Sequence, residues 1–404
     1  MAELNNPEED KLFSSTNFAS ATFVPGVPAR QPSKKKKSSN SYSNMYEGQL
    51  TNTFTTINSK KTKHSVKTLD NGGQGWLFDL TEIGGGEVTL SDPDSNTLSI
   101  TSSQLLDIIA LYLTKELPYK APDEELVNHL DCVLNVDTYM KMRDISSRED
   151  AVKQLKKDFK ALFNASTVAN ISYHKKGGKK VSEQLEVRYI DAIPKGQIKD
   201  YAHFRIALSF AKYLVHSQIM PYPVKILTAS KNKNFYYIGK KLAAHYNMNH
   251  GKKNAQSISV EALLEYTPEI PSLEEEYNRG RHYIQKCIVP LERTLEELVD
   301  KGVLSEFSWW HKKNKELNDD EFDAIFKYEG YEVTEKNENA YNSLDSEDCF
   351  GEDIKKQVFN RDSGKDYFIH FTFAEHPHDN KDDEIDYTAQ NLIKSGSESR
   401  KLGV

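Results

Sequence analysis

Apolar residues recur with the 3.6-residue period of an amphipathic helix in two separate stretches, and each stretch leads into a strand pattern. The first stretch predicts a short helix at residues 137–142, a cap at Ser146 or Ser147, and a longer helix at residues 148–163. Two helices joined by a tight turn are typical of a helix-turn-helix. The predicted buried stripe of the longer helix consists of Val152, Leu155, Phe159, Leu162 and Phe163. Lysines gather on another side of it, at Lys153, Lys156, Lys157 and Lys160.

A β-hairpin is predicted directly after this helix, because residues 167–173 and 181–190 alternate apolar and polar positions. Gly177 and Gly178 lie between these runs, and a Gly-Gly turn in this position is a strong hairpin signal. Four further positions around the turn are basic, namely Lys175, Lys176, Lys179 and Lys180. Like charges this close repel one another unless a polyanion is near, although lysines also keep an edge hairpin soluble. The helix pair and the basic hairpin together favour a DNA-binding wing.

The second stretch, residues 258–310, predicts the same order of elements. Ser259 caps a short helix, Pro268 and Pro271 end it, and Ser272 begins a second helix. The predicted buried face of this second helix consists of Leu273, Tyr277, Gly280, Ile284, Cys287, Ile288 and Leu291. The opposite face carries Asn278, Arg279, His282, Gln285 and Lys286. These side chains suit base edges and phosphates, but a solvated amphipathic helix explains the pattern of this helix equally well.

The end of the second stretch departs from a simple repeat. Pro290 falls inside the apolar periodicity, which predicts a kink or break before Glu292 and ends the DNA-reading part near Val289. A strand containing Trp309 and Trp310 follows, and the next alternating run comes only at residues 367–373. The second wing is therefore predicted as a hairpin with a long acidic insertion at about residues 311–366.

The repeated order predicts an α+β protein with two tandem winged-helix domains, each a helix-turn-helix followed by a β-hairpin wing. Domain 1 spans residues 75–195, and domain 2 spans residues 200–375. Residues 1–70 are polar and basic without helical or alternating patterns, so we expect a disordered tail there. Four consecutive lysines at residues 34–37 suit DNA phosphates, although a solvated tail is the commoner meaning of such a run. Residues 378–404 predict a second disordered tail.

Charge is divided unevenly along the chain. The 404 residues carry a net charge of −7, which by itself argues against a nucleic-acid binder. From His311 onward 23 acidic residues stand against 13 basic ones, whereas residues 1–310 hold 40 basic and 37 acidic residues. This asymmetry fits a DNA-binding body with an acidic appendage.

Other features of the composition exclude several classes of protein. Cys132, Cys287 and Cys349 are too few and too far apart for a disulfide framework or a thiolate zinc site. No apolar run approaches the roughly 20 residues that span a bilayer, and the N-terminus lacks the basic-then-apolar order of a signal peptide. We therefore expect a cytoplasmic protein that has no membrane partner.

No catalytic, cofactor or metal site is predicted, and we do not expect an enzyme. Gly239 and Lys240 lack the context of a phosphate-binding loop, because Asn234 replaces its first glycine and Lys241 its Ser or Thr. Three histidines raise the alternative of a metal-dependent nicking site, namely His370, His376 and His378. Pro377 separates the last two and ends the strand, which argues against paired metal ligands.

Residues of both halves also match a known pattern. In the second half they are Tyr236-Tyr237-Ile238-Gly239-Lys240-Lys241-Leu242-Ala243, Ser259-Val260, Leu263-Leu264, Ile270-Pro271, Arg281, Ile288, Pro290-Leu291, Leu295 and Leu298. In the first half they are Tyr139, Met140 and Arg143. Across residues 75–310 this pattern resembles the replication initiators of plasmids and integrative mobile elements. The acidic insertion and the N-terminal tail depart from that family.

The resemblance implies tandem winged-helix domains that bind repeats or inverted operators at an origin, recruit host replication proteins and have no active site. It implies DNA contacts at residues 278–286, where Arg281 joins the polar face, and on the basic helix and wing from Lys153 to Lys180. The prediction is a sequence-specific double-stranded DNA-binding initiator, either as a monomer or as a homodimer. A winged-helix transcriptional regulator of a mobile element and a metal-dependent nicking initiator are the alternatives.

Overall fold

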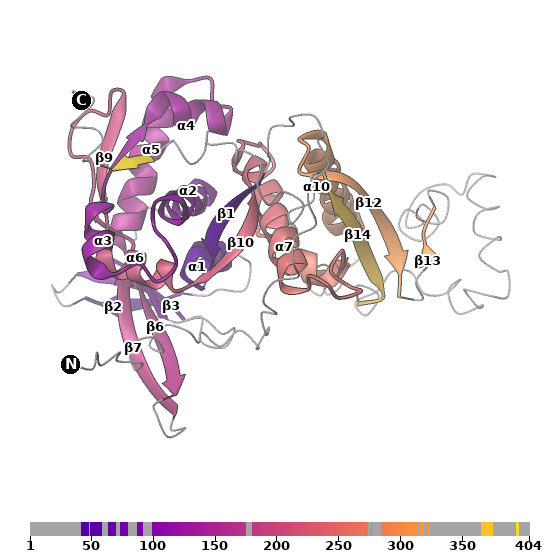
Figure 1. Cartoon of the computed structure of the whole chain (residues 1–404). Coiled ribbons are helices and arrows are strands. Elements are labelled where there is room, and N and C mark those ends of the chain that lie inside the picture. The colour runs from indigo at the N-terminus through magenta and orange to yellow at the C-terminus, as the bar shows by residue number, and fades with distance from the viewer. Residues whose placement is uncertain are drawn as a thin grey trace, which may run out of the picture. The chain divides into compact units, whose positions relative to one another are not determined.

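The computed structural model describes residues 42–47, 49–58, 64–69, 73–79, 87–91, 99–174, 180–273, 276, 284–312, 315–318, 322, 365–374 and 393–395 (Figure 1). The chain forms two compact units, which are described separately below. The first unit comprises Met1–Ala229 and Asn380–Val404, and the second comprises Ser230–Asp379. Both units mix helices with antiparallel strands, in agreement with the predicted α+β class.

The strands that the structure describes in the first unit form three sheets. The largest has the order β2-β3-β4-β6-β7, with β2 (His64–Thr68), β3 (Gln74–Asp79), β4 (Glu87–Leu90), β6 (Ala165–His174) and β7 (Lys180–Arg188). The second has the order β15-β5-β9-β8, with β15 (Ile393–Ser395), β5 (Asp131–Asn135), β9 (Tyr201–Ile206) and β8 (Ile190–Ala192). The third is the pair β1 (Tyr42–Glu47) and β10 (Gln218–Pro223).

Helix α2 (Ile100–Glu116) forms the core of the first unit, and every residue from Ser102 to Leu113 is buried. Ser99 caps it, because its hydroxyl oxygen accepts a hydrogen bond from the backbone N–H of Ser102 at 3.2 Å. A helix buried all round belongs in the middle of a unit. The other helices are α1 (Gln49–Asn58), α3 (Asp123–Asn128), α4 (Val136–Arg143), α5 (Arg148–Asn164), α6 (Leu208–Val215) and the 3₁₀-helix η4 (Val224–Leu227). No helix in the described part of the chain has the length and apolarity to cross a membrane.

The helix pair predicted for the first stretch is confirmed as α4 and α5. Asn135 caps α4 by accepting a hydrogen bond from the backbone N–H of Thr138 at 2.8 Å. Ser147 caps α5 in the same way, through the backbone N–H of Asp150 at 3.3 Å. Between the two helices Asp144 adopts the left-handed conformation, with φ of 52°, and ends α4.

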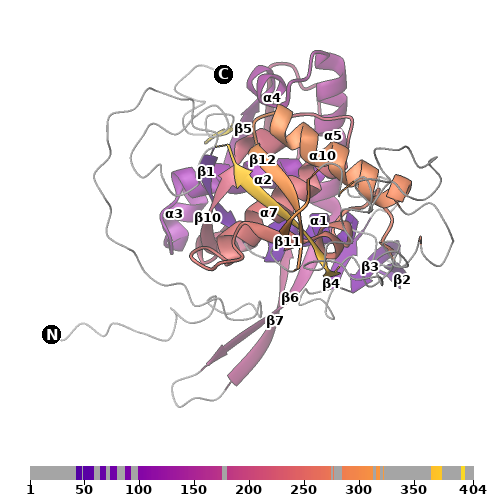
Figure 2. The ribbon, with the colours of Figure 1, turned by 90° about the vertical axis from the view of Figure 1, so that its right-hand side faces the viewer.

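The predicted hairpin is also confirmed, since β6 and β7 pair from Ser166↔Arg188 to His174↔Lys180. Strand β4 pairs with β6 only as far as Val168. Beyond Val168 the two hairpin strands pair only with each other among the described strands. At about 3.3 Å per residue this two-stranded part is roughly 20 Å long. Figures 1 and 2 both show it projecting from the body of the first unit.

The described strands of the second unit form one sheet, with the order β11-β14-β12-β13. Its strands are β11 (Ser257–Ser259), β12 (Leu304–His311), β13 (Lys315–Glu316) and β14 (Tyr367–Phe373). Its helices are α7 (Asn234–Met248), α8 (Val260–Leu264) and α10 (Val289–Asp300), with the π-helix η5 (Ile284–Ile288) before α10. Strands β12 and β14 pair from Leu304↔Phe373 to His311↔Tyr367, so the predicted late return strand is confirmed. Most of the predicted acidic insertion lies outside the described residues.

The π-helix ends just before Val289, near which the sequence predicts the end of the DNA-reading part, whereas α10 runs from Val289 through Glu292 without a break. Pro290 is in the first turn of α10 and cannot donate a backbone hydrogen bond to the preceding turn. In a regular helix the ring of a proline also clashes with the backbone carbonyl four residues earlier. A π turn adds one residue to the turn and relieves this clash. Ser259 caps α8 as predicted, since its hydroxyl accepts a hydrogen bond from the backbone N–H of Ala262 at 3.3 Å.

Structure within the two predicted tails is a correction. Strand β1 and helix α1 fall inside residues 1–70, and Met45, Tyr46 and Phe54 are buried. The few apolar residues of this segment form no local pattern that would predict a strand. Strand β1 is stabilised by pairing with the distant β10, which the local sequence does not reveal. Strand β15 falls inside residues 378–404 and pairs with β5. The lysine run at residues 34–37 lies outside the described residues.

The boundary between the units is a second correction. The sequence places it near residues 195–200, but the first unit continues to Ala229. Strand β9 belongs to the first unit because it pairs with β5, and β10 belongs there because it pairs with β1. The two units also differ in the strand that precedes the first helix of the predicted helix-turn-helix. In the second unit this strand is β11, which pairs with the hairpin strand β14. In the first unit it is β5, which pairs with β9 and β15 and not with the described strands of the β6–β7 hairpin.

Candidate nucleic-acid interface

The lysines predicted on α5 share its solvent-facing side. Lys153, Lys156 and Lys160 are exposed, and Lys157 is half-buried. The opposite side of α5 is buried and includes Leu155, Phe159 and Leu162, and α5 packs against α2. The described residues offer no carboxylate that pairs with Lys153, Lys156 or Lys157. The outer face of α5 is therefore a row of cations on a helix whose other face is fixed in the core.

Two residues of the predicted buried stripe of α5 are not fully buried. Phe163 is 42% exposed and Val152 is only half-buried. Ala151 and Asp158 occupy the buried side instead. The buried side is thus rotated toward a residue that pattern analysis counts as polar, because the core provides hydrogen-bond donors for the Asp158 carboxylate.

Asp158 is completely buried, and a single one of its oxygens accepts four hydrogen bonds. The donors to Oδ1 are Ser99 Oγ at 3.0 Å, Thr101 Oγ1 at 2.8 Å, Ser102 Oγ at 2.8 Å and Gln154 Nε2 at 3.0 Å. Burial raises the pKa of Asp158, and the hydrogen bonds from Ser102, Thr101, Gln154 and Ser99 oppose that rise. The sequence pattern does not single out Asp158 as buried, although a carboxylate between Leu155 and Phe159 of the predicted buried stripe is a usable signal.

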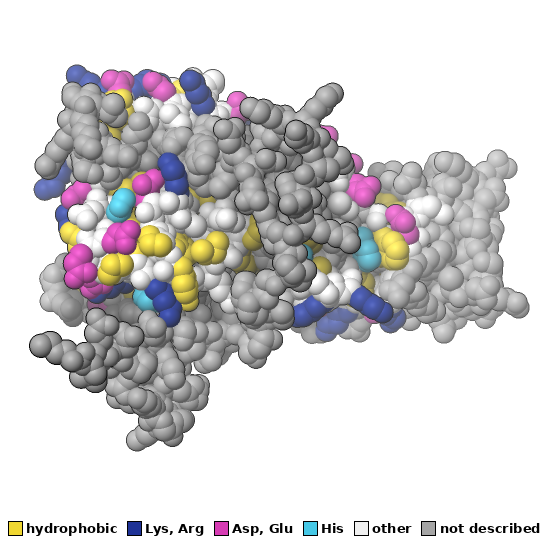
Figure 3. All heavy atoms as spheres, viewed as in Figure 1, with side chains coloured by type: hydrophobic (Ala, Val, Ile, Leu, Met, Phe, Trp, Pro, Cys, Tyr) yellow, Lys and Arg dark blue, Asp and Glu magenta, His cyan; other side chains and the backbone are white. Residues whose placement is uncertain are grey.

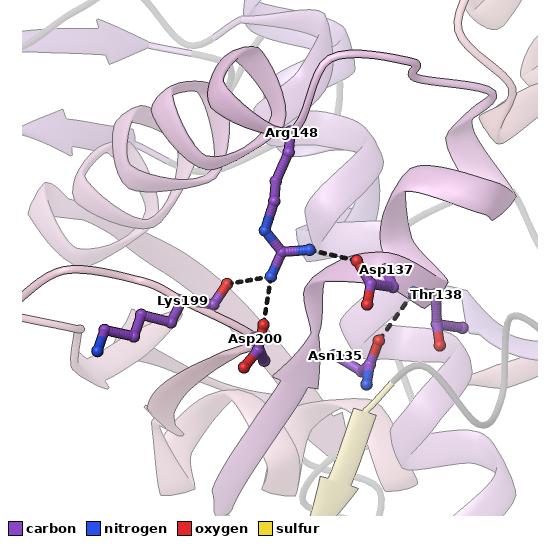
Figure 4. A network of polar contacts seen from close by, with 6 residues as sticks. All are labelled: Asn135, Asp137, Thr138, Arg148, Lys199 and Asp200. Atoms are coloured by element: carbon purple, nitrogen blue, oxygen red, sulfur yellow. Dashed lines mark hydrogen bonds and ion pairs between the residues drawn. The ribbon is translucent and has the colours of Figure 1, made fainter.

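The start of α5 is braced by Arg148, its first residue (Figure 4). Its guanidinium pairs with the carboxylate of Asp137 in α4. It also donates to Asp200 Oδ1 at 2.7 Å and to the backbone carbonyl of Lys199 at 2.6 Å, both just before β9. A guanidinium has five donors in a fixed plane, so it can connect three elements at once. Arg148 therefore holds the turn between α4 and α5, and its charge is already compensated there.

The first turn of α5 is acidic on its outer side, because Glu149 and Asp150 are exposed. Acidic side chains at a helix N-terminus interact favourably with the helix dipole. They would repel phosphates, so the positive part of the α5 surface begins at Lys153.

The hairpin lysines fall mainly outside the described residues. Lys175, Lys176 and Lys179 lie at the tip, in residues 175–179. Lys180 is the first residue of β7 and pairs with His174. The structure therefore describes the two strands of the predicted basic wing but not the lysines of its tip.

In the second unit, four of the predicted DNA contacts lie outside the described residues, namely Asn278, Arg279, Arg281 and His282. Gln285 and Lys286 are exposed in η5, on the side opposite to the buried Cys287 and Ile288. Lys286 Nζ lies 2.8 Å from Glu276 Oε2, and the side chain of Glu276 is only 2% exposed. The charge of Lys286 is thus compensated by a buried carboxylate.

Another side of the first unit has a different chemistry. Figure 3 shows hydrophobic and acidic side chains intermixed on the face that carries α3 and α6. Tyr119, Val127 and Ile219 are 52%, 46% and 44% exposed. The first turn of α3 adds Asp123, Glu124 and Glu125. An apolar and acidic surface is not suited to phosphates.

Of the three histidines that raise the alternative of a metal site, the structure describes His370. The ring of His370 stacks on that of Trp310, with 4.1 Å between the ring centroids and an interplanar angle of 13°. Burial lowers the pKa of His370. His376 and His378 lie outside the described residues. Within the described part of the chain, no three His, Cys, Asp or Glu side chains gather as metal ligands would.

Comparison with known proteins gives a distant likeness only. No protein-family model and no curated protein matches the chain. The chain is similar to domains 2 and 3 of RctB. A crystal structure of selenomethionine derivatives of these domains gives a TM-score of 0.36 at 10% identity, over 66% of this chain and 95% of that chain. Another crystal structure of RctB domains 2–3 gives a TM-score of 0.32 at 10% identity, over 59% and 78%. Both TM-scores are below 0.5, so neither likeness bears on the function of this chain.

Proposed function

We propose that this chain is a sequence-specific double-stranded DNA-binding protein that initiates replication of a plasmid or mobile element. The observation that carries the proposal is the row of lysines on the solvent-facing side of α5. Three of these lysines lack a carboxylate partner among the described residues, so their charge is available to a polyanion. Phosphate neutralisation by such residues releases counterions and supplies much of the affinity for DNA.

The form of α5 suits the major groove of B-DNA, which is about 12 Å wide and admits an α-helix. The lysines from Lys153 to Lys160 extend over roughly 10 Å of helix axis, at 1.5 Å per residue. Because Glu149 and Asp150 repel phosphates, contact is expected at the second to fourth turns of α5. The lysines position the helix on the backbone, and base reading falls to neighbouring side chains.

Both units are proposed to be winged-helix domains. In the first unit α4, α5 and the β6–β7 hairpin follow one another in that order. In the second unit the proposed order is α8, the helix predicted from Ser272 to about Val289, and then β12 and β14. The described end of that helix is η5, and β11 lies in the same sheet as β12 and β14. The β6–β7 hairpin projects as a two-stranded ribbon, and its lysines would reach phosphates beyond those contacted by α5.

Initiation is proposed from the resemblance of residues 75–310 to plasmid and mobile-element initiators. Two units in tandem suit repeated DNA sites, and initiators of this kind recruit host replication proteins without their own chemistry. The proposed partners are therefore double-stranded origin or operator DNA and host replication proteins. The same surfaces would serve a transcriptional regulator, so the experiment must separate these two functions.

The test uses the full chain and duplexes that tile the DNA around its own coding sequence. Nuclease footprinting should reveal protection of repeated sequences, and the affinity should fall steeply as salt rises. A plasmid that carries the protected repeats should then replicate in the host only when the chain is supplied. Protection limited to a promoter, with no such replication, would support a regulator. Absence of binding to every duplex would overturn the proposal.

A further inference from the structure

The cluster around Asp158 joins the lysine-bearing helix to the core helix of the first unit. Three of its donors, Ser99, Thr101 and Ser102, belong to the cap and the first turn of α2. The fourth donor, Gln154, comes from α5 itself. Gln154 Nε2 also donates to Thr101 Oγ1 at 2.6 Å, so the two helices are cross-connected.

The position at the start of α2 suits a carboxylate. The N-terminal turn of a helix has unpaired N–H groups and a positive end of the helix dipole. The Asp158 side chain is 0% exposed, and so are the side chains of Leu155 and Phe159 beside it in α5. Its second oxygen, Oδ2, has no hydrogen-bond partner among the described residues. All the directional contacts of this carboxylate therefore converge on Oδ1.

Asp158 lies roughly opposite to the lysine row on α5. An α-helix turns about 100° per residue, so Asp158 is between about 100° and 160° around the axis from each of the four lysines. Apolar contacts are not directional, and Leu155, Phe159 and Leu162 alone permit some rotation and sliding of α5. Hydrogen bonds weaken steeply when their geometry is lost. The bonds to Oδ1 can therefore fix how far α5 is rotated against α2.

We propose that Asp158 is a positioning residue for DNA binding, which sets the rotation of α5 so that Lys153, Lys156, Lys157 and Lys160 face DNA together. The inference rests on the proposed function and deepens it. It assigns a role in DNA recognition to a residue that touches no DNA. Loss of the hydrogen bonds to Asp158 Oδ1 should thus change how many lysines contact phosphates, in addition to any change in the stability of the protein.

The decisive variant combines Thr101→Val, Ser102→Ala and Asp158→Leu. It replaces Asp158 and two of its four donors with apolar groups of similar size, and it leaves Ser99 and Gln154 in place. Replacing both partners of a hydrogen bond costs less stability than removing one partner alone. The probe is the duplex that the wild-type full chain selects from a randomised pool of double-stranded DNA. We expect at least a tenfold loss of affinity and a shallower dependence of log Kd on log salt, by about two. Asp158→Asn keeps one acceptor oxygen and should stay within about threefold of the wild type.

A matched control removes another buried aspartate contact of α2. Tyr222 donates to Asp107 Oδ2 at 2.7 Å, and Asp107 is completely buried. Asp107→Leu with Tyr222→Phe should affect the melting temperature without changing the salt dependence of DNA binding. If Asp158 has only a structural role, the triple variant with wild-type melting will bind with wild-type affinity and slope, and this overturns the inference.

Two further outcomes are informative. If the triple variant does not fold, Thr101→Val with Ser102→Ala removes two of the four donors and should give an intermediate loss of affinity and slope. Wild-type binding by this double variant would overturn the inference. If the wild-type chain selects no duplex from the pool, the proposed function itself is wrong. This outcome differs from one in which the wild type binds DNA and the variants bind equally well, which would overturn only the role of Asp158.

Discussion

The ammonium of Lys286 lies 2.8 Å from a carboxylate oxygen of Glu276, whose side chain is 2% exposed. Lys286→Ala would remove this cation from a buried carboxylate, so we expect the free energy of unfolding to fall by about 1–3 kcal/mol. Gln285→Ala changes an exposed neighbour on the same turn and should cost less than about 0.5 kcal/mol. Urea denaturation compares the two variants. Equal and small effects would show that the ion pair does not brace the second unit.

The buried carboxylate of Asp158 should make stability depend on pH. Its pKa is raised by burial in the folded state, so the native state binds a proton more tightly than the unfolded chain does. Its favourable contribution is present below the usual carboxyl range and is lost as pH rises through the raised pKa. Asp158→Asn should abolish this decline. Urea denaturation at pH 4 to 8 measures it, with Asp144→Asn as a control that removes an exposed carboxylate from the neighbouring turn.

The corrected orientation of α5 predicts unequal roles for two phenylalanines. Phe159 is completely buried and Phe163 is 42% exposed. Phe159→Ala should lower the free energy of unfolding by about 3–5 kcal/mol because it leaves a cavity. Phe163→Ala should cost about 1 kcal/mol or less. Denaturant titration measures the free energy of unfolding of both variants. Similar large losses would support the orientation of α5 that the sequence pattern predicts, with both phenylalanines buried.

Arg148 should depend on the shape of its guanidinium as well as on its charge. Arg148→Lys keeps one positive charge but cannot reach Asp137, Asp200 and the carbonyl of Lys199 together. Because the site is half exposed, we expect a loss of about 0.5–1.5 kcal/mol. Lys199→Ala leaves the accepting carbonyl in place and should be nearly neutral. A thermal melt that ranks Lys199→Ala as the more damaging change would contradict this network.

Elements that depend on nearby residues could be predicted from the sequence. The cap at Ser147, the spacing of Leu155, Phe159 and Leu162, and the lysines between them suffice to predict α5. Gly177 and Gly178 between alternating runs suffice to predict the β6–β7 hairpin. These signals are local, because helix periodicity and turn chemistry act over a few residues.

Features that depend on distant partners could not be predicted. Strand β1 has little apolar pattern of its own and is stabilised by β10, far along the chain. Asp158 reads as a polar surface residue until its hydroxyl donors, 56 to 59 residues earlier, are placed beside it. Lys286 reads as a DNA contact until Glu276 is seen to be buried beneath it. Composition and spacing give the charge of a side chain but not the partner that compensates it.

The lysine face of α5 is proposed to bind phosphates of double-stranded DNA. Lys153→Ala with Lys157→Ala removes two of its four charges and leaves the buried face of the helix intact. The control, Lys252→Ala with Lys253→Ala, removes two charges from an exposed turn of the second unit.

The most direct test is fluorescence anisotropy of the full chain on the duplex selected by the wild type, over a series of salt concentrations. Each phosphate contact contributes about 0.9 to the slope of log K against log salt on B-DNA. We predict that the α5 variant loses between about one and two in slope and at least tenfold in affinity, while the control keeps the wild-type slope. An α5 variant with the slope and affinity of the wild type would contradict the account.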